Sequence, residues 1–212
     1  DKFSAWLSLS DLDSNAHPIG FATLLQDTGS SAGGGVAVSG AFDGRSPREQ
    51  PWWLVGANGQ TDTQQGQGKL KLAYDFADHL RLSYVLGMWR NEAFRDSESY
   101  LRDAEGEPVY SGPVRIGDKR YVLAPSAISL QRADLLHRMQ GLTLQQRRGG
   151  AWDYRVALSR YDYVRDELRS PLLARPLADE GGPGRIADGK GTGWQALSAS
   201  AAWRPNAAHT LE

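Results

Sequence analysis

Two short stretches of this 212-residue sequence carry the side chains best suited to binding a ligand. One contains two adjacent indoles, which combine a large apolar surface with a hydrogen-bond donor, and the other contains arginine and tyrosine side chains. The guanidinium and hydroxyl groups could meet an anionic chelate through charge-assisted hydrogen bonds. A structural role is the alternative to ligand binding, since the indoles could pack the loop onto itself or lie where an apolar environment meets water. The six candidates are Trp52, Trp53, Tyr110, Arg115, Arg120 and Tyr121.

Catalytic chemistry is not indicated by the motifs of the sequence. Cysteine is absent, which excludes a thiolate nucleophile, a thiolate zinc site and a disulfide scaffold. The 4 histidines are scattered without a partner at metal-ligand spacing, and no G-x-S-x-G or H-E-x-x-H motif occurs. The sequence therefore predicts no enzyme, no cofactor and no metal site.

Two near-matches to ion-binding motifs also fail. Residues 184–190 nearly spell a phosphate-binding loop, but Gly191 replaces the hydroxyl residue that binds magnesium, and an alternating pattern follows instead of a helix. Residues 11–15 begin like a calcium loop, but Ala16 and Ala22 stand where that loop needs glycine and glutamate. We interpret the first segment as a flexible loop tip and the second as a solvated turn.

Charge and composition exclude further classes of protein. The 24 basic and 25 acidic residues give a net charge of -1, which argues against a nucleic-acid partner. With 40% hydrophobic and 23% charged residues the chain is too apolar to be disordered. No apolar run approaches the roughly 18 residues of a membrane helix, and no stretch resembles a signal peptide.

Alternation of apolar and polar residues dominates the chain. In residues 69–76, Leu70, Leu72 and Tyr74 fall on one face and the intervening Lys69 and Lys71 on the other. Successive side chains of a strand point to opposite faces, so this period predicts strands with one apolar face. Strands are expected at 2–10, 69–76, 80–88, 135–146, 152–159 and 196–203.

The connections between these strands alternate in length. Tight turns are expected at 77–79, 147–151 and 205–208, and long loops at 11–68, 91–134 and 166–191. Within the second long loop, residues 115–122 should form a hairpin that turns at 117–119. Outer-membrane β-barrels are built in this way, with short turns on one side and long loops on the other.

The apolar faces favour the same architecture. They carry no charge, as lipid exposure requires, because a lipid-facing Arg or Lys costs about 2–4 kcal/mol at the bilayer midplane. Phe76, Trp152 and Trp203 lie beside the tight turns, where an interfacial aromatic girdle would be. A soluble antiparallel sheet also alternates, so it remains an alternative. About six strands cannot close a membrane barrel, which needs about 8, so we expect an all-β, antiparallel, up-and-down transmembrane barrel of which this chain is a part.

The chain resembles the barrel of TonB-dependent outer-membrane receptors, which have about 22 strands around a plug. The resemblance covers nearly all of residues 1–212 and consists of strand and loop patterns. It is carried by residues 17–23, 69–76, 80–91, 99–103, 108–112, 161–163, 166–170 and 191–194. The plug domain, the TonB-contacting box and the barrel-closing strand of the family are not recognised in this sequence.

This resemblance implies the function. Such receptors lie in the outer membrane of Gram-negative bacteria and import a scarce ligand with energy delivered by TonB through the plug. A ferric siderophore is the expected cargo, and outer-membrane lipid and the TonB system are the expected partners. Arg81, Asp153 and Arg155 on the polar faces would line the lumen and touch the plug. A passive porin-like channel and a soluble all-β ligand- or glycan-binding domain are the alternatives.

Overall fold

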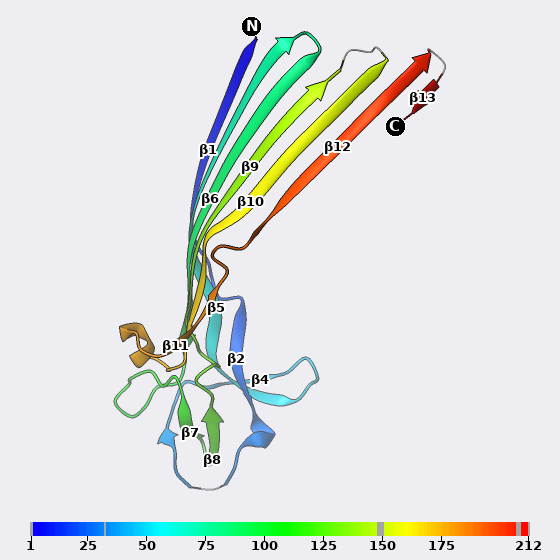
Figure 1. Cartoon of the computed structure of the whole chain (residues 1–212). Coiled ribbons are helices and arrows are strands. Elements are labelled where there is room, and N and C mark those ends of the chain that lie inside the picture. Colours follow the sequence, from blue (N-terminus) through cyan, green and yellow to red (C-terminus); the bar gives the residue numbers. More distant parts are fainter. Residues whose placement is uncertain (1, 32, 148–150, 207–208, 212) are drawn as a thin grey trace.

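The computed structural model describes residues 2–31, 33–147, 151–206 and 209–211, and within them the protein is all-β, as predicted (Figure 1). One large sheet dominates, and each pair of neighbouring long strands is antiparallel. Its main path runs β1 (Phe3–Asn15), β5 (Pro51–Ala77), β6 (Leu80–Ser99), β9 (Gln131–Gln146), β10 (Trp152–Pro171), β12 (Gly193–Asn206) and β13 (His209–Leu211). In the described part of the chain this sheet is open, because the path begins at β1 and ends at β13.

Shorter elements extend the sheet at one end. The strands β2 (Gly20–Leu25) and β4 (Phe42–Arg45) pair with β5, and β11 (Gly184–Asp188) pairs with β10. A small second sheet contains β3 (Val36–Ala37), β7 (Gly112–Ile116) and β8 (Lys119–Leu123). Two 3-10 helices, η1 (Gln26–Thr28) and η2 (Leu177–Glu180), complete the structure.

The long strands reach further than the sequence pattern predicts. β1 continues to Asn15, so the solvated turn expected at residues 11–15 is wrong, and these residues pair with Asp62 to Gly66 of β5. β5 begins at Pro51, so the loop expected at 11–68 is much shorter. Backbone hydrogen bonds to β1 on one side and β6 on the other keep this polar section of β5 extended, although its side chains have no apolar period.

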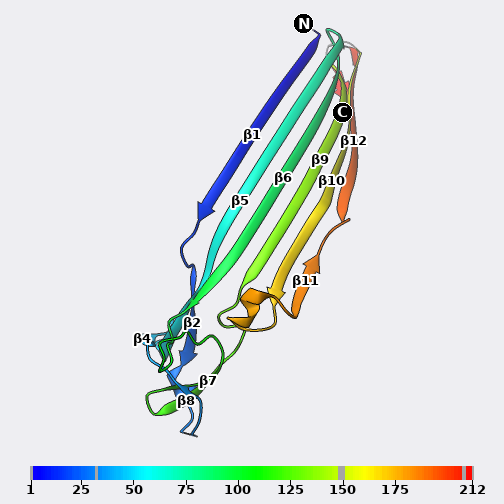
Figure 2. The same cartoon turned by 90° about the vertical axis from the view of Figure 1, so that its left-hand side faces the viewer.

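Tight turns and long connections lie at opposite ends of the sheet, as predicted (Figures 1 and 2). β5 and β6 are joined by a turn at Asp78 and His79, and the backbone N–H of Arg147 donates to the carbonyl of His79 at 2.8 Å. The tight turns expected at 147–151 and 205–208 lie partly outside the described residues.

The long connections at the other end fold into a packed unit, which we call the cap and define as residues 16–50 and 100–130 with the adjoining ends of β5 and β6. The hairpin expected within residues 115–122 is confirmed as β7–β8, and it turns at Gly117 and Asp118. Inward-facing side chains of this hairpin pack with others into a hydrophobic core, which consists of Ala22, Val55, Leu101, Val114, Ile116, Tyr121, Leu123 and Ile128.

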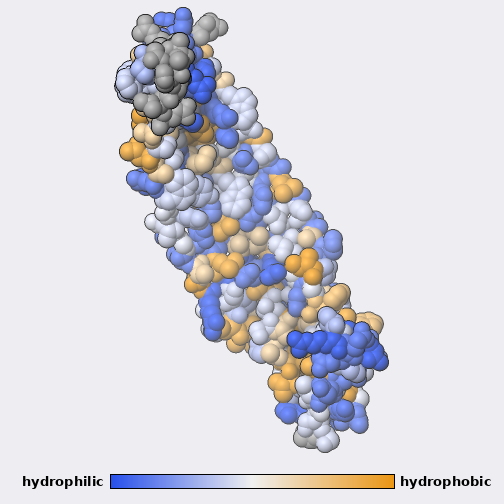
Figure 3. All heavy atoms as spheres, turned by 90° about the vertical axis from the view of Figure 1, so that its right-hand side faces the viewer, coloured by the Kyte–Doolittle hydropathy of each residue, from blue (hydrophilic) through white to orange (hydrophobic). Residues whose placement is uncertain are grey.

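The part of the sheet near the tight turns is organised differently, as a single layer of strands (Figure 2). We call the face that carries Leu72 and Leu82 the apolar face and the opposite one the polar face. Side chains of the apolar face are open to the surroundings, with Leu9 74% and Leu197 72% exposed. Figure 3 shows further hydrophobic side chains, interspersed with hydrophilic ones, along one side of the molecule. An apolar surface this extensive marks an interaction with a membrane or another protein.

Candidate functional site

The cap holds the six candidate ligand-binding residues, and two of them are locked together inside it. The indole Nε1 of Trp53 donates a hydrogen bond of 3.1 Å to the Tyr121 hydroxyl. That hydroxyl donates in turn to the Gln26 carbonyl at 3.3 Å, and Tyr121 is buried. Gly29 lies against the Tyr121 ring so closely that an added Cβ would be 2.6 Å from the ring atom Cζ. These contacts support the packing role for Trp53 and Tyr121.

Trp52, beside Trp53, lies at the start of β5 between β2 and β4. Its backbone pairs with Leu25 on one side and with Gly44 on the other. A Cβ added at Gly44 would lie 2.8 Å from the Trp52 Nε1, so the indole lies over a backbone position that has no side chain. Trp52 is half-buried and keeps part of its ring accessible to a ligand.

Arg115 and Arg120 are directly opposite each other in the β7–β8 hairpin. Their strand neighbours Val114 and Tyr121 point into the hydrophobic core, so the two guanidinium side chains project from the other face. Arg115 is exposed, and among the described residues neither side chain is joined to a carboxylate by an ion pair. Two like charges directly opposite each other disfavour folding, and an anion bound between them would relieve that repulsion.

Tyr110 is linked to another long connection by a cation–π contact. The guanidinium carbon of Arg175 lies 5.4 Å from the centre of the Tyr110 ring. Arg175 also forms ion pairs with Asp96 at 2.7 Å and with Asp179 at 2.9 Å. The hydrogen bond that Arg175 donates to Asp179 is the main reason that the pKa of Arg175 is raised above its ordinary value. Arg175 therefore fastens the connection after β10 to the end of β6 and to the cap.

The polar face of the sheet holds a cluster of aromatic side chains that the sequence analysis missed, with His137 at its centre. His137 is buried, its Nδ1 lies 2.9 Å from the Tyr161 hydroxyl, and its Nε2 lies 3.0 Å from Asp166 Oδ2. The ring centres of Trp89 and Tyr163 lie 5.1 and 4.4 Å from that of His137. This hydrogen-bonded chain joins β9 to β10 beside a β-bulge between Tyr163 and Arg165.

The signal for this cluster is the pairing register, which a single sequence does not give. His137 is opposite Trp89 on one side and Tyr163 on the other, although the three residues lie far apart in the chain. A hollow of about 180 Å³ lies beside the cluster and also touches Lys69 and Met139. The arrangement can bind through ring stacking and hydrogen bonds.

The apolar face carries a continuous uncharged area across all six long strands, which we call the apolar band. Its edge is oblique to the rows of paired residues. On β6 the band ends at Met88, which is level with Arg138 of β9 and Asp162 of β10. On β10 it ends at Leu158, four residues before Asp162. The band consists of Phe3, Ala5, Leu7, Leu9, Leu70, Leu72, Tyr74, Leu80, Leu82, Tyr84, Leu86, Met88, Leu142, Leu144, Trp152, Tyr154, Val156, Leu158, Leu197, Ala199, Ala201 and Trp203.

The opposite edge of the band, beside the tight turns, shifts in the same direction. Leu80, the first residue of β6, is opposite Gln146 of β9, which is in turn opposite Tyr154 of β10. Trp152 lies two residues closer to the turn end than Tyr154, and it stacks on Trp203 with ring centres 5.8 Å apart. The band therefore keeps a similar height while it crosses the strands at an angle.

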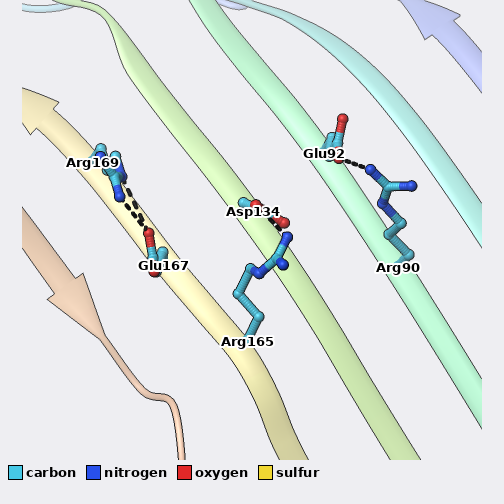
Figure 4. A network of polar contacts seen from close by, with 6 residues as sticks. All are labelled: Arg90, Glu92, Asp134, Arg165, Glu167 and Arg169. Atoms are coloured by element: carbon cyan, nitrogen blue, oxygen red, sulfur yellow. Dashed lines mark hydrogen bonds and ion pairs between the residues drawn. The ribbon is translucent and has the colours of Figure 1, made fainter.

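Beyond the band, towards the cap, the same face is covered by charged side chains in cross-strand rows. Glu92, Asp134 and Glu167 are opposite one another on β6, β9 and β10. Each is paired with an arginine, as Figure 4 shows: Arg90 with Glu92, Arg165 with Asp134 at 2.8 Å, and Arg169 with Glu167 at 2.7 Å. We call this area the charged belt, and it consists of Arg90, Glu92, Arg132, Asp134, Arg138, Arg160, Asp162, Arg165, Glu167 and Arg169.

Other possible sites contribute less. Residues 184–188 form strand β11, so the segment that resembles a phosphate-binding loop does not open a helix. Among the described residues, no group of three or more His, Asp and Glu side chains is arranged to hold a metal ion. Within the same residues, no helix is long and apolar enough to cross a membrane. Comparisons of the chain with protein families, with curated proteins and with solved structures find no match.

Proposed function

We propose that this chain is part of the barrel wall of a TonB-dependent outer-membrane receptor, with the cap as its external ligand-capturing region. The apolar face would contact lipid, and the polar face would enclose the lumen. The cargo would be a scarce small molecule, for which a ferric siderophore is the best candidate. Transport would be driven through a plug domain and would involve no chemical change of the cargo.

The oblique apolar band is the observation that carries this proposal. Strands of a membrane barrel are tilted by about 35–45°, so the edges of the lipid layer cut obliquely across rows of paired residues. From Leu80 to Met88 the band covers eight residue steps, about 27 Å along the strand. A tilt of about 40° reduces this length to a height of about 21 Å, close to the roughly 25 Å of an outer-membrane apolar band.

The polar face supports a filled lumen. The row that crosses the sheet from Ser4 consists of small side chains, namely Ser4, Ala73, Ser83, Thr143, Ala157 and Ser198. Small side chains allow a folded domain to pack closely against the wall. Near the tight turns, Asp75 pairs with Arg81 at 2.9 Å, and Asp153 pairs with Arg204 at 2.6 Å. These neutralised pairs favour contact with a plug over a channel that attracts ions.

The cap supports ligand capture. Its hydrophobic core holds β7 and β8 in place, so Arg115 and Arg120 are presented from a defined hairpin. Two neighbouring guanidinium groups are suited to an anionic chelate, because each presents several hydrogen-bond donors in a planar fork.

The proposal is tested with the complete reading frame that contains residues 1–212, expressed in a Gram-negative host. Uptake of a radiolabelled ferric chelate is measured with and without functional TonB, alongside the distribution of the protein between membrane and soluble fractions. We expect the protein in the outer membrane and uptake that requires TonB. Uptake independent of TonB would favour a porin, and a protein that stays soluble without detergent would overturn the barrel.

A further inference from the structure

Two arginines share one aspartate at the edge of the apolar band. Arg160 Nε donates to Asp162 Oδ1 at 2.6 Å, and Arg138 Nη2 donates to Asp162 Oδ2 at 3.2 Å. The arginine side chains are 52% and 42% exposed, whereas that of Asp162 is only 17% exposed. The group therefore has one net positive charge on two partly exposed guanidinium side chains, although Arg138 Nε is itself buried and has no hydrogen-bond partner among the described residues.

This excess charge separates the group from the three ion pairs of the charged belt. The three outer pairs of Figure 4 each join one arginine to one carboxylate and are neutral. The group around Asp162 lies at the edge of the band, because Arg160 follows Leu158, the last band residue of β10, by two residues, as Arg90 follows Met88 on β6. Arg132 also has no carboxylate partner among the described residues and lies over the Phe94 ring, but it is farther from the apolar band than Arg138 and Arg160.

The immediate surroundings leave this group accessible. Asp162 is opposite Gly193, which has no side chain, and Arg138 is opposite Met88, the last band residue of β6. On the same face, the Tyr84 hydroxyl donates to Gln140 Oε1 at 3.0 Å, so Tyr84 directs its polar end towards the edge of the band. Tyr84 thus has its ring in the apolar band and its hydroxyl at the edge of the band. Aromatic residues take this orientation at a membrane–water interface.

We propose that Arg138, Asp162 and Arg160 form a binding site for the phosphate of an anionic lipid headgroup. The site rests on the proposed function, because it needs the apolar band to lie in lipid. Headgroups occupy about 5–8 Å on each side of the hydrocarbon layer. Residues on one face of a tilted strand advance by about 5 Å for each row. The row of Arg160 and the next row of Arg138 and Asp162 therefore lie at the level of the lipid phosphates. The guanidinium N–H groups that Asp162 does not use bind the phosphate oxygens.

The test uses the complete protein, purified in a neutral detergent and titrated with phosphatidylglycerol while bound lipid is counted by native mass spectrometry. A basic residue near a charged membrane surface contributes roughly five-fold in affinity, so Arg138→Gln and Arg160→Gln should each weaken binding about five-fold. The double variant should weaken binding by about 25-fold. Arg169→Gln, in the outer part of the belt, is the matched control and should leave binding unchanged.

Asp162→Asn separates a binding role from a structural one. It removes the negative charge and keeps both arginines, so binding should be retained or strengthened. If the three residues only hold β9 to β10, this variant should weaken binding as much as the arginine variants, and that result would overturn the site. Unchanged binding in the double variant would overturn it as well. Equal competition by soluble glycerol phosphate would assign the site to free anions and refute the lipid.

Folding controls keep these outcomes distinct from failure of the proposed function. Every variant is first checked for insertion into phosphatidylcholine vesicles by its heat-dependent mobility in gel electrophoresis. A wild-type protein that does not insert there refutes the barrel itself. A wild-type protein that inserts, together with double-variant binding equal to that of wild type, refutes only the phosphate site.

Discussion

Replacing Leu72 with arginine tests the central claim that the apolar face meets lipid. Leu72 lies near mid-height in the apolar band, opposite Ala5 on β1 and Tyr84 on β6. An arginine at the midplane of a membrane barrel costs about 2–4 kcal/mol. With about 1.4 kcal/mol for each factor of ten, the folded population should fall by roughly 30- to 700-fold relative to the unfolded one.

The assay is folding of the complete protein into phosphatidylcholine vesicles across a urea series, followed by gel mobility and tryptophan fluorescence. Two matched variants accompany it. Lys71→Arg places an arginine at the adjacent residue, which points to the polar face, and Gln64→Arg changes a residue of the same strand and face as Leu72 beyond the band, opposite Asp13 and Glu92. Both should change the free energy of unfolding by less than about 1 kcal/mol, as surface substitutions do. Equal destabilisation by all three variants, or tolerance of Leu72→Arg, would refute lipid contact.

Three further predictions concern the cap. Gly29→Ala should lower the stability of the cap by about 1–3 kcal/mol, because the new Cβ overlaps the Tyr121 ring while the backbone φ of -68° accepts alanine. Hydrogen exchange of the cap measures this loss of stability, and unchanged protection would contradict the prediction. Arg175→Gln should increase hydrogen exchange in residues 172–183, the connection that Arg175 fastens to the cap, since about 1–2 kcal/mol of charge-assisted hydrogen bonding is lost. Equal exchange in the variant and the wild type would show that the ion pairs of Arg175 are dispensable. Arg115→Gln combined with Arg120→Gln should weaken binding of ferric citrate about ten-fold by fluorescence titration, and unchanged affinity would remove the hairpin from the binding surface.

The strand pattern was predictable wherever one side of a strand is apolar. Leu72 and its neighbour Lys71 alternate in a way that fixes their faces before any partner strand is known. The polar section of β5 from Gln60 to Gly68 gave no such signal. It is a strand because its backbone groups pair with β1 and β6, and those bonds do not require an apolar side-chain pattern. Local pattern therefore located the long strands but not their full length, and it missed the short strands β2, β3, β4 and β11.

The candidate sites show the same division between local and long-range information. The hairpin that carries Arg115 and Arg120 was predictable because its turn and both strands lie within a few residues. The environment of His137 was not, because Trp89 and Asp166 become its neighbours only through the register of three strands. The packing of Trp53 against Tyr121 depends in the same way on how two distant segments fold together.

The oblique band also restricts how the length of this chain can change over evolution. Loss of one residue within β10 would exchange its two faces beyond that point and turn Arg160 and Asp162 away from the side that carries Arg138. Loss of two residues would keep the faces but draw Arg160 towards Leu158 and into the apolar band. Related sequences should therefore differ in length within the cap and in the connection after β10, while the separation of Leu158 from Asp162 stays constant.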